Sequence, residues 1–138
     1  MAFSLYALLG NEAPSFSNES LAVDLKNYFR QEEGFSIEFE QLPFAHTKTL
    51  VLHWNMWLVR VCYEEGENVV ADSIEIQKLL GATATPALST ISKRIRIVFG
   101  DDERREHTNQ IIYIIDFLKE IHDVKIFDPQ QNNLVNSV

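Results

Sequence analysis

The sequence lacks the features that would place it in a membrane or an oxidising compartment. It has one cysteine in 138 residues, so no disulfide can form within the chain. No apolar run approaches the roughly 18 residues that a membrane-spanning helix needs. The N-terminal stretch MAFSLYALLG lacks the basic start and the length of a secretory signal. These absences predict a cytoplasmic protein without a membrane segment.

Basic side chains are also scarce. Twelve Lys and Arg residues against twenty Asp and Glu residues give a net charge of −8, of which residues 1–69 carry −6 and residues 70–138 carry −2. A nucleic-acid-binding protein needs a cationic surface to displace counterions from phosphates, so the balance argues against such a partner. The net negative charge has two interpretations: it keeps the protein soluble, or it attracts a basic partner protein.

Metal and nucleophile motifs are missing. No close ligand spacing of the C-x₂-C or H-x₃-H kind links the candidate ligands, which are His46, His53, Cys62, His107 and His122. A Cys–His pair would need Cys62 beside a histidine, but the hairpin expected below separates it from His53 by about 13 Å along the strand. We therefore predict no metal, no cofactor and a structural role for Cys62.

Motifs of other enzyme classes are missing as well. There is no P-loop, G-x-S-x-G or H-E-x-x-H sequence. Two pairs of neighbouring acids, Asp101–Asp102 and Glu64–Glu65, lack the apolar neighbours in sequence that prepare a carboxyl group for acid–base catalysis. The sequence therefore predicts that the protein is not an enzyme.

The stretch IQKLLGATATPALSTISKRI has a partial likeness to a helix-turn-helix. Thr90 lies nine residues after Gly81, however, against a usual turn of three or four, and Pro86 interrupts the stretch. The following residues read as a strand. We therefore expect Arg94 and Arg96 on the outer face of that strand and not in a DNA groove.

Hydrophobic spacing predicts strands and helices in mixed order. Alternating or short apolar runs predict strands at residues 3–9, 35–40, 49–54, 57–63, 94–99 and 124–128. Apolar stripes of helical period predict helices over about residues 19–32, 71–81 and 111–122, with a short one after Thr85-Pro86. Ser17 or Asn18 can cap the first helix, and Asp72 and Glu75 have capping-box spacing in the second.

Two of these strands predict a hairpin with a defined register. If Asn55-Met56 forms a tight turn, an apolar face contains the pairs Trp54–Trp57, Leu52–Val59 and Leu50–Val61. The opposite face then contains the pairs His53–Leu58, Val51–Arg60 and Thr49–Cys62. Every pair on the first face is apolar, which supports this register.

The order of elements predicts one α+β domain over residues 1–138, with a polar C-terminal tail from about residue 130. We expect a mainly antiparallel sheet with the hairpin at its centre and the helices packed on one face. A Rossmann arrangement fits poorly, because the first strand–helix turn has no glycine-rich phosphate loop.

The segment FGDDERREHTNQ, residues 99–110, combines six ionised side chains with a histidine. The start of the long helix explains this segment better than an active site does, because Asp101 or Asp102 can accept amide protons as a cap. A helix beginning near Asp102 would project the charges from two polar turns, whereas one beginning at Thr108 would leave them in a loop. Partner docking is the second interpretation.

Without catalytic motifs, the remaining hypothesis is binding of a basic partner. The candidate residues are the acids expected in loops or on an outer strand face, with one aromatic neighbour as an anchor. They are Glu38, Glu40, Tyr63, Glu64, Glu65, Glu67, Asp101, Asp102 and Glu103.

The layout of WLVRVCYEEGENVVADSIEI, RIRIVFGDD, HTNQIIYIIDFLKEI and VKIFDPQQNNLV resembles bacterial toxin-immunity proteins of contact-dependent growth-inhibition systems. The resemblance implies a cytoplasmic protein that binds and neutralises a cognate, usually basic, nuclease toxin. It assigns no functional residue, because such families share no invariant motif. An acidic secretion chaperone, which binds an effector as a dimer, is the alternative, although those proteins typically begin with a helix.

Overall fold

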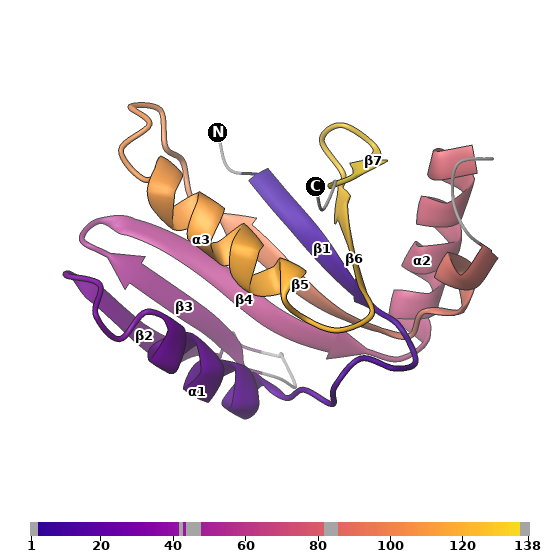
Figure 1. The fold of residues 1–138 in the computed structure, drawn as a ribbon, viewed down its shortest axis with the longest axis horizontal. Helices are drawn as coiled ribbons and strands as arrows, with labels where there is room; N and C mark the ends of the chain where they lie inside the picture. Colours follow the sequence, from indigo (N-terminus) through magenta and orange to yellow (C-terminus); the bar gives the residue numbers. More distant parts are fainter. Residues whose placement is uncertain (1–2, 42, 44–47, 82–85, 136–138) are drawn as a thin grey trace.

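The computed structural model describes residues 3–41, 43, 48–81 and 86–135. Its strands form one seven-stranded sheet in the order β2-β3-β4-β5-β1-β6-β7, and every neighbouring pair is antiparallel. The strands are β1 (Phe3–Leu9), β2 (Phe35–Glu40), β3 (Thr49–Trp54), β4 (Trp57–Glu65), β5 (Lys93–Phe99), β6 (Val124–Asp128) and β7 (Asn133–Leu134). The helices are α1 (Asn18–Tyr28), α2 (Glu67–Leu80) and α3 (Thr108–Lys119), with a 3₁₀ helix at Pro86–Thr90. The predicted α+β class is confirmed (Figure 1).

The predicted hairpin is confirmed, with five of its six expected pairs. The partners run from Leu50–Val61 to Trp54–Trp57, whereas Thr49–Cys62 lies beyond the paired residues. Asn55 has a φ of 56°, as the first central residue of a primed hairpin turn requires. The sheet then extends on both sides, because β2 pairs with β3 and β5 pairs with β4.

The helices cover both faces of the sheet, so the prediction that they share one face was wrong. α1 and α3 lie over the main core, whose residues include Leu21, Leu52 and Ile114 (Figure 1). α2 and the 3₁₀ helix pack on the opposite face through a smaller cluster of Leu8, Ile76, Leu88, Ile91 and Phe127. The reason is β1, whose run of apolar residues presents fully buried side chains to both faces.

The N-terminus of α2 also differs from the prediction. The helix begins at Glu67 after Gly66, whose φ of 115° is open to glycine but strained for other residues. Asp72 therefore lies inside the helix, and its carboxylate contacts Arg94 in place of a helix N-terminus. The predicted end is confirmed, because Gly81 follows the last helical residue with a φ of 61°.

The sequence left two alternatives open for the start of α1 and two for the start of α3, and the structure selects one in each case. Ser17 caps α1: its hydroxyl accepts from the Ser20 amide, and the Ser20 hydroxyl accepts from the Ser17 amide. α3 begins at Thr108, so the charges of residues 101–106 lie in a loop. Both helices end earlier than predicted, at Tyr28 and Lys119.

The described part of the polar tail, residues 130–135, is held against the sheet. Residues Asn133–Leu134 form β7 against β6, and the Gln130 side chain accepts from the Ser4 amide at 2.8 Å and donates to the Ser4 carbonyl at 2.9 Å. Residues 136–138 lie outside the described part of the chain. Thr85, where a helix was expected to start, also lies outside it.

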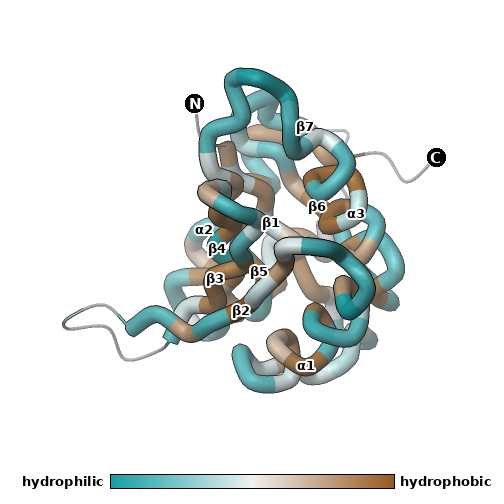
Figure 2. The backbone as a smooth tube through the Cα atoms, turned by 90° about the vertical axis from the view of Figure 1, so that its left-hand side faces the viewer, coloured by the Kyte–Doolittle hydropathy of each residue, from teal (hydrophilic) through white to brown (hydrophobic). Residues whose placement is uncertain are grey.

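The apolar and polar segments are separated in space. Hydrophobic stretches run through the strands and the inner sides of the helices, and the connecting loops are hydrophilic (Figure 2). Among the described residues, no helix combines the length and the apolar character needed to cross a bilayer. The hydrophilic loop between β5 and α3 is the one that meets the hairpin turn.

Two leucines of the hairpin test the register. Leu52 is fully buried in the main core, whereas Leu58 is only half-buried on the opposite face. We expect Leu52→Ala to lower the free energy of unfolding by about 3 kcal/mol and Leu58→Ala by about 1 kcal/mol. Urea denaturation of both variants measures the difference, and equal losses would contradict the assigned faces.

Candidate functional site

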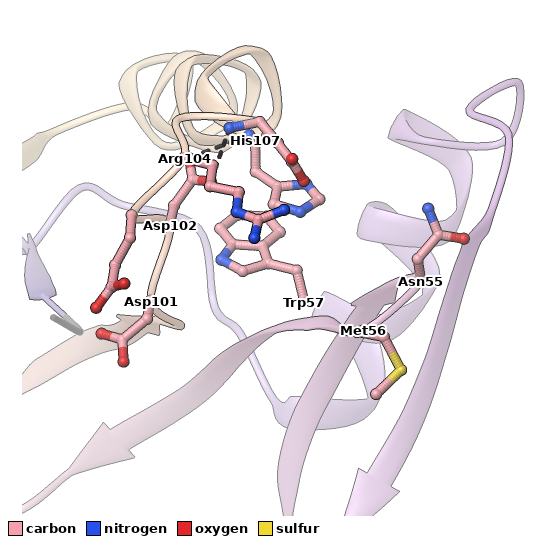
Figure 3. A pocket seen from close by; sticks show the side chains of 9 residues that line it. Asn55, Met56, Trp57, Asp101, Asp102, Arg104 and His107 are labelled. Carbon is pink, nitrogen blue, oxygen red and sulfur yellow. Dashed lines mark hydrogen bonds between the residues drawn. The ribbon is translucent and has the colours of Figure 1, made fainter.

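A hollow of about 540 Å³ lies between the β3–β4 turn and the loop that joins β5 to α3 (Figure 3). It is lined by Asn55, Met56, Trp57, Asp101, Asp102, Glu103, Arg104, Glu106 and His107. A second hollow of about 390 Å³ lies along the same loop, and Asp102 and Glu103 line both. The loop of residues 100–107, called here the acidic loop, is therefore accessible on two sides.

Gly100 joins the acidic loop to the hairpin. Its amide donates to the Leu58 carbonyl at 2.9 Å, and its carbonyl accepts from Trp57 Nε1 at 3.1 Å. A Cβ at this position would lie 2.7 Å from the Leu58 carbonyl oxygen, which is backbone and cannot turn away. The close approach therefore requires glycine, and it places the loop directly beside the hairpin turn.

Asp102 determines the shape of the acidic loop. Its carboxylate accepts from the amides of Glu106 at 2.9 Å and His107 at 3.0 Å, and its own carbonyl accepts from the amide of Arg105 at 3.0 Å. Arg105 has a φ of 55°, which closes the turn. Asp102 thus caps amides, as the sequence suggested, but those amides belong to the turn that precedes α3.

The aromatic part of the hollow is a stacked pair. The rings of Trp57 and His107 lie 4.4 Å apart with an angle of 2° between their planes (Figure 3). Trp57 itself is buried, and its neighbour Met56 at the hairpin tip is 96% exposed. The hollow therefore has a rigid aromatic wall and a freely exposed apolar side chain at its rim.

The electrostatics of the hollow favour a cation. Asp101, Asp102, Glu103 and Glu106 line it, against the single guanidinium of Arg104. All of these except Asp102 are exposed, so a ligand can reach their carboxylates. Ammonium and guanidinium groups bind such carboxylates through charge-assisted hydrogen bonds.

The candidate metal ligands among the described residues do not come together at one site. Among the described residues, no group of three or more His, Cys, Asp or Glu side chains is placed to hold a metal ion. His46 lies outside those residues. The Cys62 thiol is buried and lies 3.6 Å from the Tyr63 carbonyl oxygen, in keeping with its expected structural role.

The predicted binding residues fall in three separate places. Asp101, Asp102 and Glu103 line the hollow. Glu38 and Glu40 lie on β2 and point to the face of the sheet opposite α1 and α3, as expected from the alternation, where Glu38 contacts His53 at 2.8 Å and Glu40 contacts Arg60 at 3.2 Å. The remaining four, Tyr63, Glu64, Glu65 and Glu67, lie at the far end of β4 and the start of α2.

Glu64 was expected in a loop, but it belongs to β4 and forms ion pairs there. Its carboxylate lies 2.8 Å from Arg94 Nε and 3.7 Å from Arg96 Nε, and Asp72 Oδ2 lies 2.8 Å from Arg94 Nη1. Arg94 is buried beneath α2, so the prediction that it lies on an outer face was wrong. Burial alone would lower the pKa of Arg94, but the two carboxylates raise it above its usual value.

Tyr63 lies in β4, within the strand predicted over residues 57–63, whereas Glu65 was expected in a loop and lies in β4 as well. The Tyr63 ring packs against the main core, and its hydroxyl donates to Glu65 Oε2 at 2.8 Å. The Tyr63 amide donates to the side chain of Asn18 at the start of α1. These contacts bind Tyr63 into the fold, which leaves the acidic loop as the best candidate site.

Sequence reasoning missed several residues of the hollow: Asn55, Met56, Trp57, Arg104, Glu106 and His107. The hairpin register already placed Asn55 and Met56 at an exposed turn. It gave no indication that residue 100 would contact Leu58, because that contact depends on the pairing of β4 with β5. The stacking of His107 on Trp57 follows from the same pairing.

Asp102 and Glu103 separate the structural and the docking roles within the acidic loop. We expect Asp102→Ala to lower the free energy of unfolding by about 1 kcal/mol or more, because two amides lose their acceptor. Glu103→Ala removes an exposed carboxylate and should change it by less than about 0.5 kcal/mol. Chemical denaturation compares the two, and a larger loss for Glu103→Ala would contradict the assignment.

The raised pKa of Tyr63 leads us to expect a change in the free energy of unfolding at high pH. Burial, and then the hydrogen bond to Glu65, raise the pKa of Tyr63 to about 12 from 10.0. The folded state therefore keeps a proton that the unfolded state loses, and this contribution to stability is complete below pH 10 and is lost between pH 10 and about 12. We expect Tyr63→Phe to make stability fall less steeply over that range. Denaturation at a series of pH values measures the slopes; identical slopes would refute the coupling.

No protein-family model, curated protein or solved structure matches this chain. The function is therefore argued from the site and from the sequence. The feature that carries most weight is the set of accessible carboxylates around the acidic loop.

Proposed function

We propose that the protein is a non-catalytic inhibitor of the immunity type, which binds a basic, nuclease-like toxin protein in the cytoplasm through the acidic loop. The observation that carries the proposal is the set of four carboxylates, Asp101, Asp102, Glu103 and Glu106, around the hollow beside the hairpin turn. The net charge of −8 supports the same polarity of partner.

The geometry suits rapid and selective association. Asp102 already fixes the loop through three backbone contacts, so binding would order few additional residues. Glu103 and Glu106 are exposed and supply an attractive field for a cationic surface. Met56 supplies an apolar contact at the rim of the hollow, next to the buried ring of Trp57.

The toxin class comes from the resemblance of the chain's layout to immunity proteins of growth-inhibition systems. Such a protein needs no catalytic group of its own, because it acts by occluding the toxin's active site or a neighbouring surface. A nuclease that binds phosphates has a cationic surface, which matches the carboxylates of the acidic loop.

A pull-down of the tagged protein from its native host, followed by mass spectrometry, tests the function. Recovery of a basic nuclease-like protein at 1:1, with loss of its nuclease activity, would support the proposal. Recovery of no basic partner in repeated experiments would refute it. A homodimer by light scattering that brings down a long effector would instead identify a secretion chaperone.

The double variant Glu103→Gln/Glu106→Gln tests the acidic loop within that complex. The two carboxylates are exposed, so we expect stability to be retained and the affinity for the recovered toxin to fall about tenfold or more, with a weaker dependence on salt. Calorimetry at two salt concentrations measures both effects. Glu12→Gln/Glu75→Gln is the control, because it removes equal charge from exposed side chains elsewhere.

A further inference from the structure

A second surface of the protein is the outer edge of β2. The strand order places β2 at one end of the sheet, where it pairs with β3 on one side. In Figure 1 its other side forms the lower rim of the sheet. A strand at the edge of a sheet presents unpaired backbone donors and acceptors, which are a template for another strand.

The hairpin determines which backbone groups of β3 face β2. In a hairpin closed by a two-residue turn, the flanking residues, here Trp54 and Trp57, exchange both backbone hydrogen bonds. Bonding direction then alternates along the strand. The backbone groups of Val51 and His53 are therefore directed away from β4 and toward β2.

The same alternation assigns the free groups of β2. Glu38 and Ser36 are the partners of Val51 and His53, so their backbone groups face β3. The intervening residues Phe35, Ile37 and Phe39 therefore direct their N–H and C=O groups to the open edge. Within the described part of the chain, no backbone hydrogen bond joins these three residues to another element, so three donor–acceptor pairs are available along the edge.

The side chains beside this edge have two distinct characters. Phe35, Ile37 and Phe39 point to the face that α1 covers, where Phe39 remains 45% exposed. Glu38 and Glu40 point to the opposite face, where Glu38 Oε1 lies 2.8 Å from His53 Nε2 and Glu40 Oε1 lies 3.2 Å from Arg60 Nε. The Glu38 side chain is still 65% exposed, so its second carboxylate oxygen is accessible to a further donor. The Phe39 ring already has a cation over it, because Lys48 Nζ lies 5.7 Å from its centroid.

These features select one kind of occupant. An added strand would place one set of alternate side chains against Phe39 and its apolar neighbours, and the other set beside Glu38 and Glu40. Apolar and basic residues in alternation satisfy both. A second copy of the chain, paired through its own β2, would bring Ser36, Glu38 and Glu40 to that face and no basic side chain of the added strand.

We propose that the outer edge of β2 binds an extended segment of a partner protein, with alternating apolar and basic residues, as an additional antiparallel strand. This surface is separate from the acidic loop and goes beyond the function proposed above. It needs no contact with the hollow, and it would recognise an extended backbone and the alternation of side chains, whereas the hollow would recognise mainly charge.

A peptide of about eight residues with alternating valine and lysine is a suitable probe, because it matches the length of an ordinary strand. In antiparallel addition, the valines lie opposite Phe35, Ile37 and Phe39 and use their backbone groups to bind them. We expect N-methylation of the valines to lower the affinity at least about tenfold and N-methylation of the lysines to leave it within about twofold. Fluorescence anisotropy of the labelled peptides measures both.

Two variants of β2 test the same edge from the protein side. Phe39→Pro removes the outward N–H as well as the ring, whereas Phe39→Ala removes the ring alone. We expect the proline variant to bind the valine–lysine peptide at least about tenfold more weakly than the alanine variant. If the proline variant does not fold, the comparison of the two methylated peptides on the unaltered protein decides the question alone.

The charge requirement has a matched control. Glu38→Lys/Glu40→Lys and Glu12→Lys/Glu75→Lys change the net charge of −8 by the same amount, but only the first pair lies on β2. We expect the first variant to lose affinity for the valine–lysine peptide about tenfold more than the second. Glu103→Gln/Glu106→Gln should bind the peptide normally, which separates this proposal from that for the acidic loop.

Three outcomes would overturn the proposal. Equal effects of the two methylated peptides would show that backbone pairing is not used. Equal effects of the two charge-reversal variants would show that the binding depends only on the net charge of the protein. A homodimer by light scattering that Phe39→Pro dissociates would show that a second copy of the chain, and not a basic segment, occupies the edge.

Discussion

The pairing of β4 with β5 is the interaction on which the rest of the structure depends. It runs from Val59–Phe99 to Glu65–Lys93 and joins the three strands β2, β3 and β4 to the other four. At one end it brings the acidic loop against the hairpin turn, and at the other it brings Glu64 to Arg94. Because its partners are far apart in sequence, a large loop must close before any of these contacts forms.

The negative charge of the chain serves two different purposes. At the far end of β4, Glu64 and Asp72 compensate the buried guanidinium of Arg94, where an unpaired charge would be strongly destabilising. In the acidic loop, Asp102 accepts backbone amides, while Glu103 and Glu106 remain exposed. Net charge alone therefore overstates the acidic surface that is available to a partner.

The two proposed binding surfaces differ in physical character. The acidic loop offers side-chain carboxylates around a preformed hollow, so its attraction to a cation is screened by salt. The edge of β2 offers backbone groups in a fixed direction, with side chains that favour one alternation. The first favours fast association with a basic surface, and the second selects the conformation of what is bound.

Much of the fold was determined by local sequence. The alternation of residues 49–63 predicted the hairpin and its register, because a shift by one residue would reverse every side chain. Ser17 was recognisable as a cap, and Gly81 as a helix end, because each supplies a local geometry that few residues tolerate.

Tertiary structure decided the features whose partners are distant in the chain. Arg94 and Glu64 had the sequence appearance of surface residues. The packing of α2 over β5 buried Arg94, and the pairing of β4 with β5 placed Glu64 opposite it. The hollow required Trp57 and His107 to meet across the β4–β5 pair. Periodicity reports which face of its own element a residue occupies, whereas the neighbour on that face depends on packing between elements. The acidic loop was therefore visible in the sequence as a charged segment, and only the fold made it the wall of a site.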